Sequence, residues 1–186
     1  MTPLVPPAAG APRQLRPTEV KRLNREWRRV TGARLALLLD SVSQPFNVGS
    51  IVRSAAAFGA ERLWLCGSTA PLGHPGAAKT ALGTQRLVEA TVEPDPAAAA
   101  KAAAAAGLRV VVVELASGAV PLSEAPLDGD VCLAVGHEDR GCTAALLAVA
   151  DAVTYIPQPG RVGSLNVAVA AAVAMAEARR REWTSR

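Results

Sequence analysis

A glycine-rich turn near the C-terminus places two polar side chains at the start of an otherwise apolar helix. Residues 156–166 read IPQPGRVGSLN and lead into a run of small residues. Ser164 is the expected N-cap of this helix, because a serine hydroxyl accepts hydrogen bonds from unpaired backbone N–H groups. Asn166 is expected to serve neither as a cap nor in the core. The turn is therefore either an ordinary strand-to-helix junction or one shaped around a ligand.

A second polar segment, residues 40–59, reads DSVSQPFNVGSIVRSAAAFG. Asn47 is the expected cap of the helix in this segment. Arg53 shares a helix face with Gly49 one turn earlier and Ala57 one turn later. Because these neighbours have almost no side chain, they leave room for a partner to approach the guanidinium. The plainer interpretation is a solvated surface arginine.

A third segment, LAVGHEDRG, covers residues 133–141. Gly136 ends an apolar run, where glycine permits a positive φ or the close approach of another backbone. Glu138 could bind a ligand, hold an arginine or assist the start of the next helix. His137 has the chemistry of a general base, although a lone loop histidine is more often incidental, and the same holds for His74.

The three polar segments follow apolar runs that alternate with helical patterns. Continuous apolar strands of this kind predict an α/β fold with a mostly parallel sheet covered by helices on both faces. Ligands bind beyond the carboxyl ends of such strands, where these segments lie. The sequence has neither G-x-G-x-x-G after the first strand nor G-x-x-x-x-G-K-[ST] anywhere. The binding of a dinucleotide or a nucleoside triphosphate therefore lacks its usual sequence support. The expected strands are 34–40, 62–67, 86–92, 108–115, 131–136 and 152–157, and the expected helices are 17–31, 47–59, 95–107, 142–149 and about 164–182.

The last expected helix is built almost entirely of small residues. We expect Leu165, Val169, Ala172 and Val173 to form its packing stripe. Alanines on the other faces would allow another backbone to come close, either within the chain or across a dimer interface.

Composition limits the classes of protein that this chain can belong to. Half of its 186 residues are hydrophobic but only 3% are aromatic, so the core must consist of Ala, Val and Leu. No apolar run reaches the roughly 18–20 residues of a membrane span. The N-terminus does not read as a signal peptide, and a cytoplasmic location is the expectation. An odd number of widely spaced cysteines argues against disulfides or a zinc site and favours buried thiols; they are Cys66, Cys132 and Cys142.

Basic residues are concentrated at the two ends of the chain. Residues 1–34 hold eight basic and two acidic side chains, residues 177–186 hold four and two, and residues 35–176 hold eight and twelve. This distribution suggests either a polyanion bound at the periphery or solvated helix faces. Residues 1–16 are expected to be disordered. The basic helix that follows is expected to start at the N-cap Thr18 and to place Val20, Leu23 and Trp27 at helical spacing.

Taken together and in this order, the three polar segments resemble the SpoU-TrmH family of SPOUT RNA 2′-O-ribose methyltransferases. The resemblance covers about residues 34–178. Departures from the family pattern occur at His137, at Asp139-Arg140, at Gln158-Pro159 and at Gly163. The family motif N-x-G-x-x-x-R is matched by Asn47, Gly49 and Arg53. The motif G-x-E-x-x-G is matched by Gly136, Glu138 and Gly141. The I-P-x-x-G turn and the S-L-N that follows it are matched by Ile156, Pro157, Gly160, Ser164, Leu165 and Asn166.

The resemblance implies an architecture and a cofactor. The C-terminal segment would be threaded into a deep trefoil knot, an exception to the general avoidance of knots. S-adenosylmethionine would sit bent in that knot, held largely by backbone groups. Members of the family are homodimers whose active site lies near the subunit interface, and no metal is implied. The implied cofactor-binding residues are Gly136, Ile156, Leu165, Leu115, Gly160 and Ser164.

The resemblance also implies a catalytic set in which Arg53 is the central residue and the others order it, the substrate and the cofactor. An arginine with a pKa of about 12.5 or more is a poor base. We therefore prefer a role in which Arg53 clamps the target's phosphate and stabilises the developing alkoxide, while the proton passes to phosphate or water. The set is Arg53, Asn47, Glu138, Ser164 and Asn166.

The expected substrate is RNA, with tRNA favoured over 23S rRNA because a compact body with basic helices at its ends resembles the tRNA enzymes. A resistance-type or housekeeping 23S rRNA methyltransferase is the nearest alternative. A knotted RNA-binding protein without catalysis is another. The expected division is a tail over 1–16, a basic helix over 17–33 and the methyltransferase domain over 34–182. The residues expected to bind RNA are Lys21, Arg22, Arg25, Arg28, Arg29 and Arg53.

Overall fold

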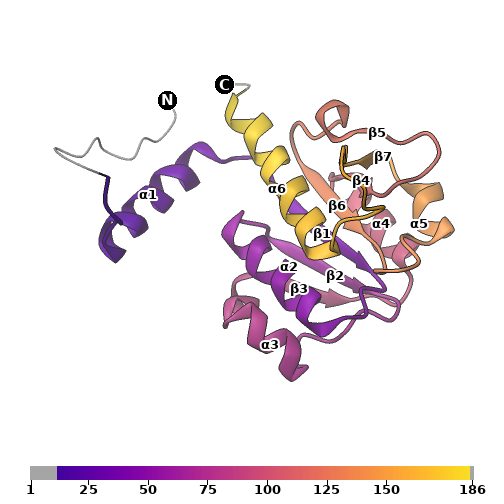
Figure 1. Ribbon diagram of the computed structural model, residues 1–186, viewed down its shortest axis with the longest axis horizontal. Coiled ribbons are helices and arrows are strands. Elements are labelled where there is room, and N and C mark those ends of the chain that lie inside the picture. Colours follow the sequence, from indigo (N-terminus) through magenta and orange to yellow (C-terminus); the bar gives the residue numbers. More distant parts are fainter. Residues whose placement is uncertain (1–11, 185–186) are drawn as a thin grey trace.

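The computed structural model describes residues 12–184 and contains a seven-stranded parallel sheet between two layers of helices (Figure 1). Residues 1–11 of the expected disordered tail lie outside the described residues. The strand order across the sheet is β3-β2-β1-β6-β4-β7-β5. The strands are β1 (Leu35–Asp40), β2 (Arg62–Cys66), β3 (Glu89–Val92), β4 (Arg109–Val113), β5 (Val120–Pro121), β6 (Val131–Val135) and β7 (Ala152–Tyr155).

Six α-helices and two short 3₁₀ helices connect these strands within residues 12–184. The predicted parallel sheet with helices on both faces is confirmed, whereas the trefoil knot stays a prediction. The helices are α1 (Pro17–Val30), α2 (Pro45–Ala57), α3 (Pro75–Ala81), α4 (Pro96–Ala105), α5 (Ala144–Val149), α6 (Val167–Thr184), η1 (Thr84–Leu87) and η2 (Leu122–Glu124).

The pleat of β1 divides the core into two halves. Leu35, Leu37 and Leu39 face the layer that contains α2 and α6. Ala36 and Leu38 face the layer that contains α4 and α5. All six residues of β1 are buried, because helices cover both faces of the sheet.

Local sequence signals predicted several element ends correctly and missed others. The helix expected at 95–107 is observed as α4, and Asp95 caps it, with its carboxylate accepting a hydrogen bond from Ala97 N at 2.9 Å. The strand expected at 86–92 begins only at Glu89, because Thr84–Leu87 forms η1. Helix α3 was not predicted. His74, which had no expected role, caps α3 by accepting from the N–H of Gly76.

The expected packing stripe of the last helix is wrong. Leu165, Val169 and Val173 are exposed at 36%, 49% and 38%. The buried face of α6 is instead made mainly of small side chains, because this helix packs closely against α2 and β6. The residues of that face are Val167, Ala168, Ala171, Ala174, Met175 and Ala178, together with the charged pair Arg179 and Glu182.

The space expected beside Gly49 for a partner of Arg53 is also filled. A Cβ atom at Gly49 would overlap the carbonyl oxygen of Ala77 and the hydroxyl of Thr80, both on α3. The glycine therefore permits α2 and α3 to pack closely. It does not open a path to the guanidinium of Arg53.

A buried ion pair on α6 anchors two segments of the chain, the one before β1 and the one between α2 and β2. Arg179 Nη1 donates to Glu182 at 2.8 Å, and the same guanidinium donates to the carbonyls of Ala33, Phe58 and Gly59. Glu182 also accepts from the backbone N–H of Ala33. Burial raises the pKa of the Glu182 carboxyl, but its backbone hydrogen bonds and Arg179 outweigh burial, so the pKa lies below its ordinary value.

The helix α1 projects from the body and has no buried residue (Figure 1). It starts at Pro17 after Arg16, so the expected Thr18 cap is wrong. Trp27 contacts Trp183 of α6 with ring centroids 4.4 Å apart. The three cysteines are buried as expected, and burial raises the pKa of the Cys66 thiol to about 12.

We expect Arg179→Met to lower the free energy of unfolding by roughly 3–5 kcal/mol, because the buried Glu182 carboxylate would lose the countercharge of Arg179. Urea unfolding followed by circular dichroism measures this loss. The matched control is Arg180→Met, whose pair with Glu177 is screened by solvent on the Arg180 side and should contribute little to stability. Equal losses in the two variants would contradict the anchoring role of the buried pair.

Candidate functional site

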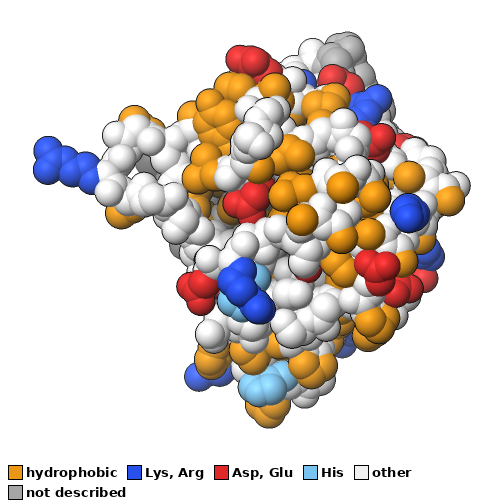
Figure 2. Space-filling model, turned by 90° about the vertical axis from the view of Figure 1, so that its right-hand side faces the viewer, with side chains coloured by type: hydrophobic (Ala, Val, Ile, Leu, Met, Phe, Trp, Pro, Cys, Tyr) orange, Lys and Arg blue, Asp and Glu red, His pale blue; other side chains and the backbone are white. Residues whose placement is uncertain are grey.

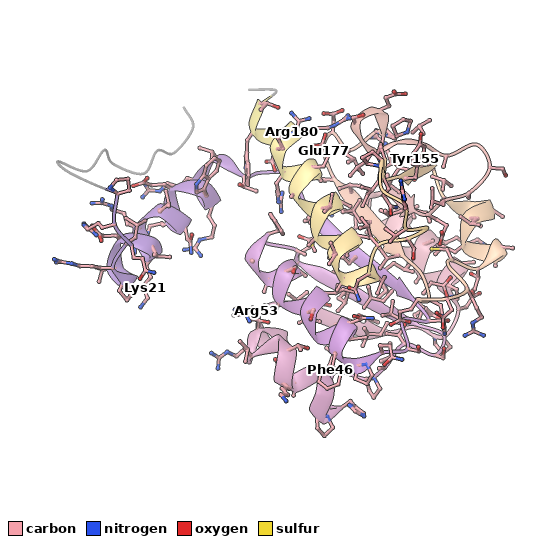
Figure 3. All side chains as sticks on the ribbon, in the orientation of Figure 1. Lys21, Phe46, Arg53, Tyr155, Glu177 and Arg180 are labelled. Carbon is pink, nitrogen blue, oxygen red and sulfur yellow. The ribbon has the colours of Figure 1, made fainter. Side chains whose placement is uncertain are left out.

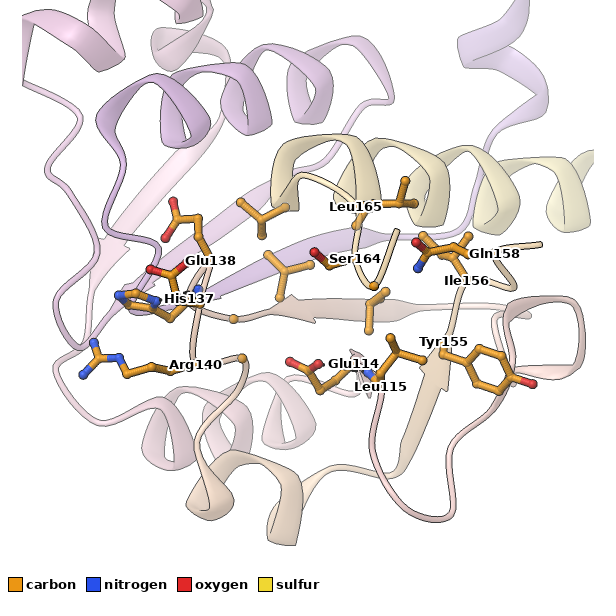
Figure 4. A pocket seen from close by; sticks show the side chains of 18 residues that line it. Glu114, Leu115, His137, Glu138, Arg140, Tyr155, Ile156, Gln158, Ser164 and Leu165 are labelled. Carbon is orange, nitrogen blue, oxygen red and sulfur yellow. Dashed lines mark hydrogen bonds between the residues drawn. The ribbon is translucent and has the colours of Figure 1, made fainter. Parts of the chain in front are cut away.

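A pocket of about 360 Å³ opens at the carboxyl ends of the adjacent strands β6, β4 and β7 (Figure 4). Its walls are the loops that leave these three strands and the first turn of α6. This is where an open parallel sheet binds ligands, and the volume lies within the roughly 300–1,000 Å³ range of small-molecule sites. Figure 2 shows the same side of the molecule, where acidic, basic and histidine side chains are interspersed with hydrophobic ones.

The loop after β6 folds back on itself as a tight hairpin. His137 and Gly141 exchange two backbone hydrogen bonds of 3.1 and 2.9 Å. A Cβ at Gly136 would overlap the backbone of Gly141 and Cys142, so only glycine fits at the base of the hairpin. Gly141 has a φ of 68°, which also favours glycine. The close backbone approach expected at Gly136 is confirmed.

Two carboxylates at neighbouring strand ends hold the far side of this hairpin. Glu114, directly after β4, accepts from the N–H of Cys142 at 2.9 Å. Asp40, the last residue of β1, is fully buried and accepts from the N–H of Thr143 at 2.8 Å. Each carboxylate satisfies a backbone N–H that no strand partner reaches.

Glu138 connects the hairpin to the start of α2. Its carboxylate accepts from Ser43 N at 3.1 Å, Ser43 Oγ at 3.2 Å, Gln44 N at 3.0 Å and Asn47 Nδ2 at 2.9 Å. Burial raises the pKa of the Glu138 carboxyl, but these hydrogen bonds outweigh burial, so its pKa lies below its ordinary value. The Glu138 carboxylate thus binds the turn before α2 rather than an arginine or the start of the helix that follows it, and ligand binding by this pocket residue stays a prediction.

Asn47 extends this connection to α6. Its Oδ1 accepts from Asn166 Nδ2 at 2.9 Å. Asn47 is therefore not the cap of α2, since that helix begins two residues earlier and Gln44 occupies the N-cap position. The two asparagines and Glu138 form one hydrogen-bonded chain across all three polar segments.

Asn166 is the residue that caps α6. Its Oδ1 accepts from Ala168 N at 2.9 Å and Val169 N at 3.3 Å. The expected N-cap Ser164 is wrong, because the helix starts at Val167 and Ser164 stands three residues before it. Ser164 is exposed and lines the pocket instead.

Most of the residues expected at the cofactor lie around the pocket. Gly160 is the exception, since it lies on the exposed turn and is not part of the lining. The expected residues in the lining are Gly136, Ile156, Leu165, Leu115 and Ser164.

Arg53 lies apart from the rest of the expected catalytic set. It is exposed on α2, and it is not among the residues that line the pocket (Figure 3). The structure thus brings Glu138, Asn47 and Asn166 together and leaves Arg53 on the outer surface.

Among the pocket residues that were not assigned to the site from the sequence are Glu114, Gln158 and His137. Glu114 lies near the carboxyl end of the strand expected at 108–115, and that position was a usable signal. Gln158 stood out only as a departure from the family pattern. His137 lines the pocket, and its Nδ1 accepts from the N–H of Asp139, which shapes the hairpin.

Apart from Arg53 on α2, the residues expected to bind RNA occupy one exposed face of α1. At 100° per residue, the five basic side chains fall within an arc of about 120°. The basic residues near the C-terminus differ, since Arg179 pairs with Glu182 and Arg180 with Glu177. These two arginines are therefore engaged in ion pairs within the chain. The exposed basic residues of α1 are Lys21, Arg22, Arg25, Arg28 and Arg29.

Comparison with known proteins identifies relatives of this fold and site. Residues 34–176 match the model of the SpoU rRNA Methylase family. The 23S rRNA (guanosine(2553)-2′-O)-methyltransferase RlmP of Bacillus subtilis is 36% identical over 141 residues, which are 76% of this chain and 56% of the relative. The chain thus spans little more than half the length of that relative.

Solved structures of similar proteins share the architecture. The SpoU methyltransferase AviRb of Streptomyces viridochromogenes, in complex with AdoMet, is 29% identical with a TM-score of 0.75, covering 83% of this chain and 62% of its own. A solved structure that concerns the 2-OH methylation of C/U34 on tRNA is 32% identical to this chain, with a TM-score of 0.67. The match covers 83% of this chain and 99% of that structure's chain. Since the family model matches most of the chain and the fold agrees, the chain belongs to the SpoU rRNA methylase family.

Proposed function

We propose that this chain is an S-adenosylmethionine-dependent RNA 2′-O-ribose methyltransferase. The observation that carries the proposal is the hydrogen-bonded chain from Glu138 through Asn47 to Asn166, which joins the three motif segments beside one pocket. The names of RlmP and AviRb support the same activity. Retention of this polar chain together with Arg53 and Ser164 argues against a knotted RNA-binding protein that has lost catalysis.

The pocket residues fit S-adenosylmethionine. Leu115, Ile156 and Leu165 supply apolar surface for a flat base, and Glu114 and Glu138 supply negative charge near an ammonium group. When bound, the cofactor supplies an activated methyl group. The tight hairpin at Gly136 and the anchored loop before α6 hold the pocket walls in place, which favours an aligned reaction geometry.

Arg53 has the charge and shape to bind the target nucleotide. Its planar guanidinium can take two phosphate oxygens at once and can stabilise the alkoxide that develops on a ribose 2′-oxygen. A proton leaving that hydroxyl would pass to phosphate or water, since arginine stays protonated. Glu138, Asn47 and Asn166 act as positioning residues, because their polar groups bind one another.

We also propose that the chain forms a homodimer through the layer that contains α2 and α6. Leu165, in the loop just before α6, and Val169 and Val173 on that helix form an exposed apolar stripe at four-residue spacing. Leu165 belongs to the pocket lining as well, so a partner on this stripe would lie at the pocket. Arg53 lies on the exposed face of the adjacent α2, where it could reach a second subunit.

The proposed substrate is tRNA, with 23S rRNA as the alternative. The similar structure that concerns 2-OH methylation on tRNA is matched over 99% of its own length. This match supports the interpretation of the chain as a compact tRNA enzyme. RlmP supports the 23S rRNA alternative. Residues 12–184 contain no helix that is both long and apolar enough to cross a membrane. A cytoplasmic location, like the division into tail, basic helix and catalytic domain, stays a prediction.

The function is tested by calorimetric titration with S-adenosylmethionine and by mapping 2′-O-methylation in total RNA with and without the gene. We expect cofactor binding by the wild type and by Arg53→Lys, and a loss of about 100-fold in kcat for the variant, because an ammonium cannot reproduce the planar guanidinium. Arg109→Lys, at the opposite end of the sheet, is the matched control. If Arg53→Lys kept nearly the full kcat of the wild type, the proposed role of the planar guanidinium would be contradicted.

We expect Glu138→Gln to lower the free energy of unfolding by about 1–2 kcal/mol at pH 7, because the amide keeps only one acceptor oxygen for four donors. The depressed pKa means that the stabilisation is complete above the ordinary carboxyl pKa and is lost as the pH falls. The gap between variant and wild type should therefore narrow below about pH 4.3. Denaturation series at several pH values measure the gap, with the exposed Glu124→Gln as control. A gap independent of pH would refute the role of the charge.

Replacing Lys21, Arg22, Arg25, Arg28 and Arg29 by glutamine should weaken RNA binding and flatten its salt dependence. Each lost phosphate contact reduces the slope of log K against log salt by about 0.7–0.9. Fluorescence anisotropy at several salt concentrations measures the slope, and cofactor affinity should stay unchanged. An unaltered slope would show that α1 does not bind the RNA backbone.

A further inference from the structure

Gln158 carries a polar atom that the fold itself does not satisfy. Its Oε1 is buried and has no hydrogen-bond donor within residues 12–184. Gln158 lines the pocket, and Figure 4 shows its amide directed toward the pocket interior. A buried amide oxygen without a donor destabilises a structure, so such an atom in a pocket indicates a donor on the ligand.

The loop around Gln158 explains why the chain supplies no local donor. Pro157 and Pro159 flank the glutamine, and proline has no backbone N–H. Proline also fixes its own φ and restricts the residue before it, so Gln158 sits on a stiff segment. The amide is thereby held in the pocket with its acceptor unpaired.

The surroundings of Gln158 indicate the kind of group that would donate. In Figure 4, Ile156 and Leu165 lie with Gln158 toward one end of the pocket, whereas His137, Glu138 and Arg140 lie toward the other. Apolar side chains suit the faces of a heterocyclic base, and the charged end suits an amino acid group. An edge amino group on the base would then face the Gln158 oxygen.

We propose that Gln158 is a specificity residue for the cofactor's base, with its Oε1 accepting a hydrogen bond from the exocyclic 6-amino group of a purine. The inference rests on the proposed function, because the cofactor is taken to carry adenine. It assigns a role to one of the positions at which this chain departs from the family pattern. A 6-oxo purine would be disfavoured, since two carbonyl oxygens would face each other.

Calorimetric titration with two probes tests the inference without turnover. The probes are S-adenosylhomocysteine and its 6-oxo counterpart, S-inosylhomocysteine. We expect the wild type to bind the 6-amino probe about three- to tenfold more tightly, and Gln158→Leu to lose that preference by weaker binding of the 6-amino probe. Gln158→Met, which keeps the side-chain length, should behave in the same way.

The matched control is Gln85→Leu, because Gln85 Oε1 is also buried without a donor but lies in η1, away from the pocket lining. It should keep the preference of the wild type. An unchanged preference in both Gln158 variants, with thermal unfolding confirming that they fold, would overturn the inference alone. Failure of the wild type to bind either probe would overturn the proposed function, and the inference with it.

Discussion

The hydrogen bonds of the Glu138 carboxylate are the constraint on which the site depends. They fix the hairpin after β6 against the turn that begins α2. Asn47 continues the connection to Asn166, which caps α6. The position of the last helix and of the loop before it is thus coupled to the other two motifs. The three segments form one unit because each polar group satisfies another.

The same physical need recurs at the neighbouring strand ends. Asp40 and Glu114 accept backbone N–H groups of the segment that follows the hairpin. Loops at the edge of a parallel sheet carry N–H groups without strand partners, and buried carboxylates satisfy them. These acids are therefore part of the scaffold. Gln158 contrasts with them, since its oxygen has no donor within the described residues.

Sequence patterns predicted the parallel sheet because its strands are continuously apolar, and the family motifs contain six of the residues that line the pocket. The caps of α2 and α6 could not be predicted in the same way. Ser164 and Asn166 both carry an acceptor suitable for a cap, and the choice depends on where the helix starts. The face of α6 that packs against the core could not be predicted either, because a helix that is apolar on nearly every side has no preferred face. Its alanines face the core since α2 and β6 lie close.

The sequence by itself determined the order of most strands and helices, the three motif segments and the basic face of α1. These features depend on local periodicity and on residue types at fixed spacing. Only the tertiary structure decided that Glu138 binds Asn47 and Asn47 binds Asn166, which lie 91 and 119 residues apart. It also placed Arg53 outside the pocket and left Gln158 without a donor. Hydrogen-bond partners at such separations depend on how the chain packs, and packing is not encoded in any local pattern.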